Sequence, residues 1–440
     1  MTSRGSLYSL AQRASGVDYS APFTKINGMA GDEDRLTAGT EALLEELLLH
    51  AYRNVPYYHA LFEGHGLVEG GRVEVSRFDS LPLLTKETIR EHASGFTSTG
   101  ARGRGTYEDS TGGSTGEPLH VMKDAAYDGW RIACQLYFYR EFLCLDYFRA
   151  RKLSFSNPFR WPPNGPKRSL GEWLNNSARL DGLLLTEDAM GGYVKRLNSF
   201  RPDSVQGMAD TLYELGRFIE ARGLKVHRPK VVVSYDVMLY DHMREEIEAA
   251  FGCKVHDLYG AVEAGMIAGE CGSGSMHVFS FDSKVELLPG GKGGEAEIVV
   301  TPLHNFAMPL IRYRIGDEAF PGVSKCGCGS VLPTIGRVAG RTTDYFVRED
   351  GGLVHGLYFI SLLRDAKEIR AFQVVQEDYE RIRILVRAAG LSEAWRRSVE
   401  EKVRLAMGPA CRVVWEFVDE VPRTPLGKHL FVKSLVHRDR

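Results

Sequence analysis

The segment between Arg228 and Gly260 constrains the fold more than any other part of the sequence. KVVVSY at 230–235 is a short apolar run, as expected of a buried strand. YDHMREEIEAAFG at 240–252 has the spacing of a helix that ends at a glycine, and CKVHDLY at 253–259 predicts a second strand. Strand, helix and strand in this order predict a βαβ unit and therefore an α/β fold with parallel strands.

The residues that follow this unit are candidates for a binding site. Ligands of open parallel sheets bind beyond the carboxyl ends of the strands. The run Tyr259-Gly260-Ala261-Val262-Glu263 lies at the end of the second predicted strand. We therefore expect these residues to border a ligand.

Two domains are predicted, because 440 residues exceed the size that one hydrophobic core usually serves. KVELLPGGKGGEAEIVVTPL at 284–303 predicts two antiparallel strands joined by a Gly-rich turn, which departs from the βαβ rhythm. We expect a large N-terminal domain over 1–340 with parallel βαβ sheets, and a small α+β C-terminal domain over 341–440. Gly340 and its small polar neighbours tolerate backbone rotation, so we expect the small domain to be mobile. Its predicted elements are strands at 372–376, 381–388 and 411–418 and a helix from Ser392 to Met407.

Two helices are expected in the N-terminal part, over residues 38–62 and from about Asp124 to Phe142. The second carries an aromatic series that fits either the protein core or the wall of a ligand pocket. Its members are Tyr127, Trp130, Tyr137 and Phe138.

The charge balance gives no long-range attraction for nucleic acid or an anionic membrane, because the formal net charge is only −2. The N-terminal residues lack the apolar stretch of a signal peptide, and no window resembles a membrane span. We therefore expect a cytoplasmic protein that acts on small molecules, without nucleic acid or membrane partners. The oligomeric state stays open, with a homodimer among the options.

The segment from Asp109 to Pro118 is rich in hydroxyl side chains and glycine, DSTGGSTGEP. Backbone N–H groups and hydroxyls in such a loop can wrap phosphate oxygens. The loop lacks the Gly-Lys-Ser/Thr ending of P-loop NTPases, so that mechanism does not apply. Taken alone, the segment is equally compatible with a flexible connector.

Five segments occur in the order and spacing of the motifs of acyl-adenylate-forming enzymes, the superfamily of acyl-CoA synthetases and adenylation domains. The chain resembles this superfamily throughout; each motif is weak alone, but five in register form a specific pattern. The segments are the loop Ser110–Gly116, resembling the Ser/Thr/Gly phosphate motif; Tyr259–Glu263, resembling Tyr-Gly-x-Thr-Glu; Arg312–Asp317, resembling Tyr-Arg-Thr-Gly-Asp; Gly340–Asp344, resembling the hinge segment that begins Gly-Arg; and Arg423–Lys428, resembling Arg-Thr-x-x-Gly-Lys. Within the superfamily, AMPLIRYRIGDEAF and a short Cys-x-Cys resemble the phenylacetate–CoA ligase branch, and TGGSTGEP and DGGLVHG resemble its capsule-biosynthesis-like members.

The resemblance implies how ATP would be held. Tyr259 would pack on the adenine, with Gly260 beside it in the nucleotide site. Asp317 would accept hydrogen bonds from the ribose hydroxyls, and Glu263 would ligate Mg²⁺, which favours carboxylate oxygen. Lys428 would bridge the attacking carboxylate and the α-phosphate, and Arg341 would contact ribose or phosphate, although an interdomain ion pair is an equal alternative for Arg341. The β- and γ-phosphates would be bound by Ser110, Thr111, Gly112, Gly113, Ser114, Thr115 and Gly116.

The implied activity is ATP-dependent conversion of a carboxylic acid to an acyl adenylate, followed by transfer to CoA. The same adenylate serves an amide or ester synthetase and an enzyme that loads a carrier protein, and a protein that has lost catalysis is a further alternative. Three residues depart from the family pattern: Val262 stands in place of Thr, Thr343 in place of a charged residue, and Glu117 in place of Lys. These departures leave the acyl acceptor open.

The acid is expected to bind where the predicted parallel strands end. The pocket residues would be Gly207, Ser234, Tyr235, Asp236 and Leu258, and the family favours an aromatic acid.

A metal site is predicted separately. Cys326 and Cys328 form a turn, and Cys271 with His277 lies upstream at a spacing that a hairpin can fold back. Three thiolates and one imidazole suit structural Zn²⁺, and some members of the phenylacetate–CoA ligase branch carry a similar set. The alternative is four unrelated residues in turns and in the core.

Overall fold

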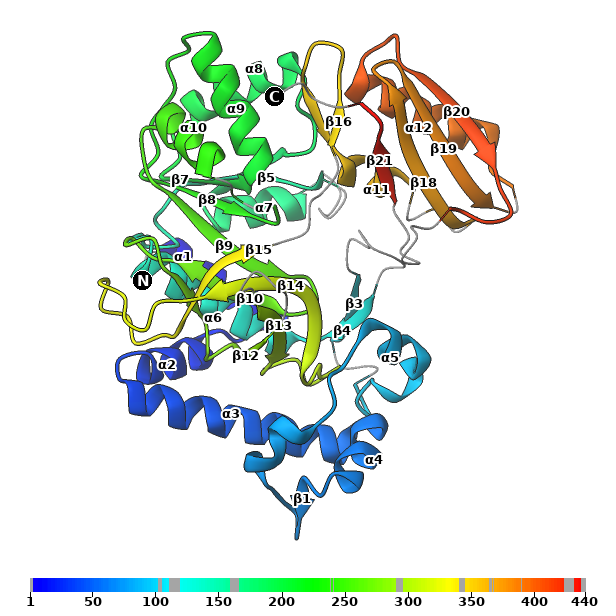
Figure 1. The fold of residues 1–440 in the computed structure, drawn as a ribbon. Coiled ribbons are helices and arrows are strands. Elements are labelled where there is room, and N and C mark those ends of the chain that lie inside the picture. Colours follow the sequence, from blue (N-terminus) through cyan, green and yellow to red (C-terminus); the bar gives the residue numbers. More distant parts are fainter. Residues whose placement is uncertain are drawn as a thin grey trace.

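The computed structural model describes residues 3–101, 105–110, 119–158, 166–237, 239, 241–289, 296–339, 345–363, 366, 368–388, 390–422 and 431–436. The predicted α/β class is confirmed. Over this part of the chain the largest sheet has 11 strands, in the order β12-β13-β14-β15-β11-β10-β9-β8-β7-β5-β6. A smaller four-stranded sheet lies beside it in the C-terminal part (Figure 1).

One half of the large sheet is parallel. Its strands are β5 (Lys152–Ser156), β6 (Ser177–Asp181), β7 (Ser204–Met208), β8 (Val231–Tyr235) and β9 (Val255–Ala261). The crossover helices are α7 (Pro166–Leu174), α8 (Glu187–Phe200), α9 (Ala209–Ala221) and α10 (Asp241–Phe251).

The predicted βαβ unit is β8, α10 and β9. α10 ends before Gly252, whose φ of +66° is a left-handed conformation that glycine adopts without strain. Ile247 and Phe251 of this helix are fully buried in the cluster that joins it to the strands. Full burial of such a side chain contributes about 1.5–3 kcal/mol, so packing holds the helix on the sheet.

The other half of the sheet is antiparallel. It consists of β10 (Gly265–Glu270), β11 (Met276–Val278), β12 (Ser283–Pro289), β13 (Ala296–Pro302), β14 (Tyr313–Pro321) and β15 (Thr334–Ala339). β12 and β13 pair from Ser283↔Pro302 to Pro289↔Ala296, which confirms the antiparallel pair expected at 284–303. β9 therefore stands at the switch from parallel to antiparallel pairing.

The N-terminal part is mainly helical. It begins with four helices: α1 (Ser3–Ala14), α2 (Ser20–Met29), α3 (Glu33–Asn54) and α4 (Pro56–Gly64). The elements that follow, in chain order, are β1 (Val68–Glu69), β2 (Arg72–Val73), the 3-10 turn η1 (Val75–Ser80), α5 (Lys86–Glu91), η2 (Ala93–Gly95), β3 (Tyr107–Ser110), β4 (His120–Lys123) and α6 (Ala125–Glu141). α6 fits the helix expected from Asp124, whose side chain accepts a hydrogen bond from the Tyr127 amide.

The single helix expected over 38–62 was wrong. Two helices occupy this region, and the first begins earlier, at Glu33, where Asp32 caps it by accepting from the Arg35 amide. They are separated at Val55, which is extended with φ −118° and ψ 110° because a residue before proline disfavours helical backbone.

The C-terminal part contains β16 (Tyr345–Val347), β17 (Leu353–His355), α11 (Gly356–Leu363), β18 (Ile369–Asp378), β19 (Arg381–Ala388), α12 (Glu393–Met407), β20 (Arg412–Phe417) and β21 (Val432–Ser434). Ser392 caps α12 as its side chain accepts from the Trp395 amide. The strands expected at 372–376, 381–388 and 411–418 lie in the four-stranded sheet, ordered β20-β19-β18-β21. The predicted boundary after residue 340 lies outside the described residues and stays a prediction.

Hydrophobic clusters join the two parts. Leu183 and Met208, near the carboxyl ends of β6 and β7, pack with Phe346, Tyr358 and Phe359 of the C-terminal part.

None of the helices in the described part of the chain is both long and apolar enough to cross a membrane.

Candidate functional site

The large sheet brings Tyr259 and Asp317 together, although 58 residues separate them. Tyr259 lies on β9 and Asp317 on β14, and the tyrosine hydroxyl donates to Asp317 Oδ2 at 2.9 Å. In the sheet order β10, β11 and β15 stand between these two strands, so the contact does not come from direct strand pairing. The two residues predicted to hold adenine and ribose thus form one bonded unit.

Glu263 lies in the turn between β9 and β10 and is buried. Tyr313 donates its hydroxyl to Glu263 Oε1 at 3.0 Å, and Lys86 Nζ lies 4.0 Å from the same oxygen. One carboxylate oxygen is therefore oriented by a hydroxyl beside a positive charge. That arrangement suits a carboxylate that must keep one rotamer while it holds a cation.

Gly260 is required by the close approach of two strands. A Cβ at this position would lie 2.4 Å from the carbonyl oxygen of Gly265. Any side chain would push β9 and β10 apart, and these strands flank the turn that holds Glu263. Glycine is therefore required at position 260 of the predicted motif for steric reasons, whether or not a ligand binds.

Lys86 was missed by the sequence reasoning. It begins α5, where Thr85 is the N-cap and accepts a hydrogen bond from the Thr88 amide. The capping pattern Thr-Lys-Glu-Thr could have located the start of a helix, but nothing local indicates that the lysine reaches Glu263, 177 residues later. Only the tertiary fold brings them together.

The strand pair β3–β4 holds the two ends of the predicted phosphate loop. Ser110 is opposite His120, and Lys123 Nζ lies 2.8 Å from Asp109 Oδ2. Burial lowers the pKa of Lys123, and the Asp109 carboxylate counters this shift. The loop residues Thr111, Gly112, Gly113, Ser114, Thr115 and Gly116 lie outside the described residues, as do Arg341 and Lys428, so their roles stay predictions.

The residues predicted to bind the acid lie toward the carboxyl ends of the parallel strands. Gly207 is opposite Ser234, and Tyr235 is opposite both Met208 and Leu258. Asp236 has φ +65°, a strained conformation for a non-glycine residue directly after β8. All five lie where a ligand of such a sheet is expected.

Their side chains already have defined neighbours. Tyr235 donates its hydroxyl to the Phe155 carbonyl at 2.7 Å, across the end of the sheet. A Cβ at Gly207 would lie 3.0 Å from the Phe155 Cβ, so Gly207 serves packing inside the sheet. Ser234 donates to Asp257 Oδ1 at 2.5 Å and faces a polar network on the opposite side. Tyr235, its register partner Leu258 and Asp236 are the members of the set that lie furthest toward the carboxyl ends of the strands.

The fold also brings together the predicted metal ligands. The ligand atoms of Cys271, His277, Cys326 and Cys328 all lie within 4.8 Å of one another. Cys271 Sγ is 3.6 Å from Cys326 Sγ, and Cys328 Sγ is 3.3 Å from His277 Nε2. The hairpin of β10 and β11 supplies two ligands, and the loop between β14 and β15 supplies the others.

The surroundings of this cluster fit a metal. His277 Nδ1 is 2.8 Å from the Leu332 carbonyl, a contact that fixes the tautomer with a free lone pair on Nε2, toward the thiols. The amides of Cys328 and Ser330 point at the sulfurs of Cys326 and Cys328, at 3.5 and 3.4 Å. Burial raises the pKa of the Cys326 thiol, but hydrogen bonds from Ser275, the Cys328 amide and His277 outweigh it and lower the pKa. The donor set suits tetrahedral Zn²⁺.

Comparison with known proteins shows the same architecture. A family model described as the CapK C-terminal domain matches residues 346–435. Protein CapK of Staphylococcus aureus is 24% identical over 412 residues, covering 88% of this chain and 86% of that protein. Phenylacetate-coenzyme A ligase of Thermus thermophilus is 25% identical over 338 residues, covering 71% and 72%. A solved structure of 2-hydroxyisobutyryl-CoA ligase with 2-HIB-AMP and CoA in the thioesterification state has a TM-score of 0.58 at 15% identity, covering 91% of this chain and 90% of that one.

The shared fold and the relatives support the expectation, drawn from the five motifs, that the chain resembles the acyl-adenylate-forming superfamily. The relatives further support its placement in the phenylacetate–CoA ligase-like branch of that superfamily, and the C-terminal match points to the CapK-like members.

Proposed function

We propose that the protein activates a carboxylic acid with ATP, forms an acyl adenylate with release of pyrophosphate, and transfers the acyl group to CoA. The observation that carries the proposal is the convergence of Tyr259, Asp317 and Glu263 at the end of β9. Tyr259 and Glu263 come from one segment, whereas Asp317 lies 58 residues after Tyr259. The CoA ligases among the solved relatives share this fold, and their activities motivate the choice of acceptor.

Each residue of the described site has a physical task in this proposal. Tyr259 packs against the adenine, while Asp317 accepts from the ribose hydroxyls and fixes Tyr259 through their shared hydrogen bond. Glu263 holds Mg²⁺, which neutralises phosphate charge when bound. Tyr313 keeps the carboxylate in place.

Lys86 supplies a cation next to Glu263 that the motif comparison did not include. Glu117 stands where many relatives carry lysine, so the phosphate loop lacks one positive charge. Lys86, with a side chain that is largely buried, places a charge close to the carboxylate that holds the metal. We assign to it part of the electrostatic stabilisation of the triphosphate.

Lys428 completes the adenylation site in the proposal, with Arg341 at the hinge. Rotation of the small domain would remove Lys428 after the first half-reaction and open the site to the thiol. An aromatic acid remains the proposed substrate class, bordered by Tyr235, Asp236 and Leu258. An amine, a hydroxyl or a carrier-protein thiol are the alternative acceptors.

The two half-reactions are tested separately. Exchange of labelled pyrophosphate into ATP, measured across a panel of carboxylic and amino acids, reports adenylation without the acceptor. CoA, a carrier protein and candidate amines are then added one at a time with the acid that supports exchange. Exchange with at least one acid, abolished by Lys428→Ala and by Glu263→Gln, is expected. No exchange with any acid would leave a nucleotide-binding protein without catalysis.

We also propose that Cys271, His277, Cys326 and Cys328 hold one structural Zn²⁺. All four positions of a tetrahedral ion are then filled by protein, so the metal has no open site for catalysis. It ties the β10–β11 hairpin to the β14–β15 loop. Metal analysis should give about one zinc per chain for the wild type and a small fraction of this for Cys271→Ser; Cys144→Ser, an exposed thiol outside the cluster, is the matched control.

A further inference from the structure

The sheet has a gap on one side of β9. This strand pairs with β8 from Val255 to Leu258, whereas its pairing with β10 extends only from Ala261 back to Leu258. The edge from Val255 to Asp257 therefore has no strand partner on the β10 side in the described chain. A cavity of about 510 Å³ borders this edge, between α10, the Glu270–Met276 hairpin and β15.

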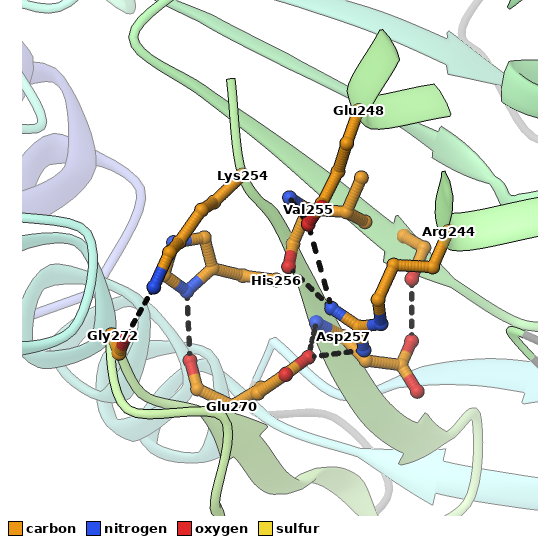
Figure 2. A network of polar contacts seen from close by, with 9 residues as sticks. Arg244, Glu248, Lys254, Val255, His256, Asp257, Glu270 and Gly272 are labelled. Atoms are coloured by element: carbon orange, nitrogen blue, oxygen red, sulfur yellow. Dashed lines mark hydrogen bonds and ion pairs between the residues drawn. The ribbon is translucent and has the colours of Figure 1, made fainter. Parts of the chain in front are cut away.

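Side chains take the place of the missing strand (Figure 2). Glu248 Oε1 accepts from the Val255 amide at 3.0 Å, and Arg244 Nη1 donates to the Val255 carbonyl at 2.7 Å. Glu270 Oε2 accepts from the Asp257 amide at 2.8 Å. A buried backbone group without such a partner costs about 1–3 kcal/mol, so these bonds decide whether the strand stays extended here.

Arg244 and Glu270 act as one unit at this edge. The second arm of the guanidinium, Nη2, lies 2.8 Å from the Glu270 oxygen that accepts from Asp257. The glutamate side chain is 9% exposed and the arginine side chain 29%. A guanidinium reaches a carbonyl and a carboxylate at once because its donors form a planar fork, whereas a lysine ammonium is a single point charge.

The braced segment leads directly into the nucleotide site. Asp257 is two residues before Tyr259 on the same strand, and Tyr259 bonds Asp317. We propose that Arg244 and Glu270 are positioning residues of this site: as a substitute for a strand, they set the register and direction of β9 and thereby place Tyr259 for ATP. The inference rests on the proposed function, since it assumes that Tyr259 faces the nucleotide.

Asp257 distinguishes this role from plain structural support. Its carboxyl borders the cavity, and burial raises its pKa to about 6. The Ser234 hydrogen bond and Arg244 lower this pKa, and Glu270 raises it. The charged and polar groups facing the cavity and Asp257 are Asp241, Arg244 and Glu248 from α10, Lys254 just before β9, His256 from β9, Glu270 from β10, Cys271, Ser273 and Ser275 from the hairpin after β10, Arg337 from β15 and Ser234 from β8. Loss of Arg244 and loss of the Glu270 charge must therefore shift the pKa of Asp257 in opposite directions.

Titration calorimetry with Mg·ATP tests the proposal on the full chain. Arg244→Ala and Glu270→Ala should each weaken Mg·ATP binding about tenfold, and the double variant should be no weaker than the worse single variant. When Mg·ATP affinity is plotted against pH, the pH of the inflection should rise in Arg244→Ala and fall in Glu270→Gln. Arg244→Lys keeps the positive charge, so the pH of the inflection should stay at its wild-type value. Its Mg·ATP affinity should nevertheless be lower than that of the wild type.

A matched ion pair in the small sheet provides the control. Arg383 lies 2.9 Å from Glu377, and its side chain is 35% exposed, close to the value for Arg244. Arg383→Ala should leave Mg·ATP affinity and its pH profile unchanged. Unaltered affinity in both Arg244→Ala and Glu270→Ala, or an inflection that moves the same way in Arg244→Ala and Glu270→Gln, would overturn the proposal.

Hydrogen exchange separates this failure from failure of the proposed function. If the wild type does not bind Mg·ATP, the assigned function is wrong, but the bracing of β9 is still measured on the ATP-free protein. The peptide covering 254–259 should exchange faster in Arg244→Lys and Glu270→Gln than in wild type or Arg383→Ala. Equal exchange in all four proteins would refute the bracing itself.

Discussion

Gly260→Ala tests whether the close approach of β9 and β10 builds the site. A Cβ at residue 260 would lie 2.4 Å from the Gly265 carbonyl oxygen. Ordinary contact of a carbon with an oxygen needs roughly 3.3 Å, so the two strands must separate by close to an ångström. The turn between them carries Glu263, and Tyr259 is the neighbouring residue on β9.

Two quantities should change in this variant. The free energy of unfolding should fall by about 1–3 kcal/mol, as for other overpacked sites. Pyrophosphate exchange should fall about a hundredfold, because a displacement of this size misplaces the binding groups. Urea denaturation measures the first quantity and labelled pyrophosphate the second.

Gly192→Ala is the matched control, since a Cβ there meets nothing within 4 Å and the residue lies inside α8. Alanine within a helix should raise stability by about 0.5–1 kcal/mol and leave exchange unaltered. Wild-type stability and exchange in Gly260→Ala would refute the steric argument, and a large exchange loss in Gly192→Ala would show that exchange responds to any glycine change.

Further predictions address single contacts. Tyr259→Phe should weaken Mg·ATP binding about threefold to tenfold, because it removes only the hydroxyl that bonds Asp317, and Asp317→Ala should weaken it more; equal losses measured by calorimetry would contradict separate roles. Lys86→Met should reduce pyrophosphate exchange about tenfold or more without lowering the urea midpoint, and unchanged exchange would remove Lys86 from the site. A zinc chelator should lower the urea midpoint of the wild type but not that of Cys271→Ser, which should start lower; an equal effect on both would argue against the metal. Burial raises the pKa of Asp282 to about 7 from its ordinary value of 3.8, so its protonated form stabilises the fold at low pH and this contribution is lost as pH rises through about 7. Asp282→Asn should therefore gain stability relative to wild type on going from about pH 5 to about pH 8, and denaturation curves that shift in parallel would contradict this sign.

The sequence predicted the parts of the fold that depend on local pattern. The βαβ unit ending at Gly252, the capped helices after Asp124 and Ser392, and the β12–β13 pair all follow from periodicity, caps and turns. The helix expected over 38–62 failed because apolar spacing continues across Val55-Pro56, where the backbone cannot. Hydrophobic pattern alone did not reveal that break.

The candidate site also has residues that the sequence indicated and residues that it did not. Motif order indicated Tyr259, Glu263 and Asp317, and hairpin spacing indicated Cys271, His277, Cys326 and Cys328; the structure shows the contacts of the first three and brings the four Cys and His side chains together, and their roles stay predictions. Lys86 and Arg244 could not be found in this manner, because each matters through a partner that only the tertiary fold supplies. The contact of Ser234 with Asp257 likewise depends on the pairing of β8 with β9, which places the two residues opposite each other.

The central claim is that this chain adenylates a carboxylic acid, and exchange of labelled pyrophosphate into ATP tests it most directly. Wild-type protein with a panel of acids should show exchange that depends on the acid and on Mg²⁺ and that disappears in Glu263→Gln and Lys428→Ala. Exchange that persists in both variants, or its absence with every acid in a protein that binds Mg·ATP, would contradict the account.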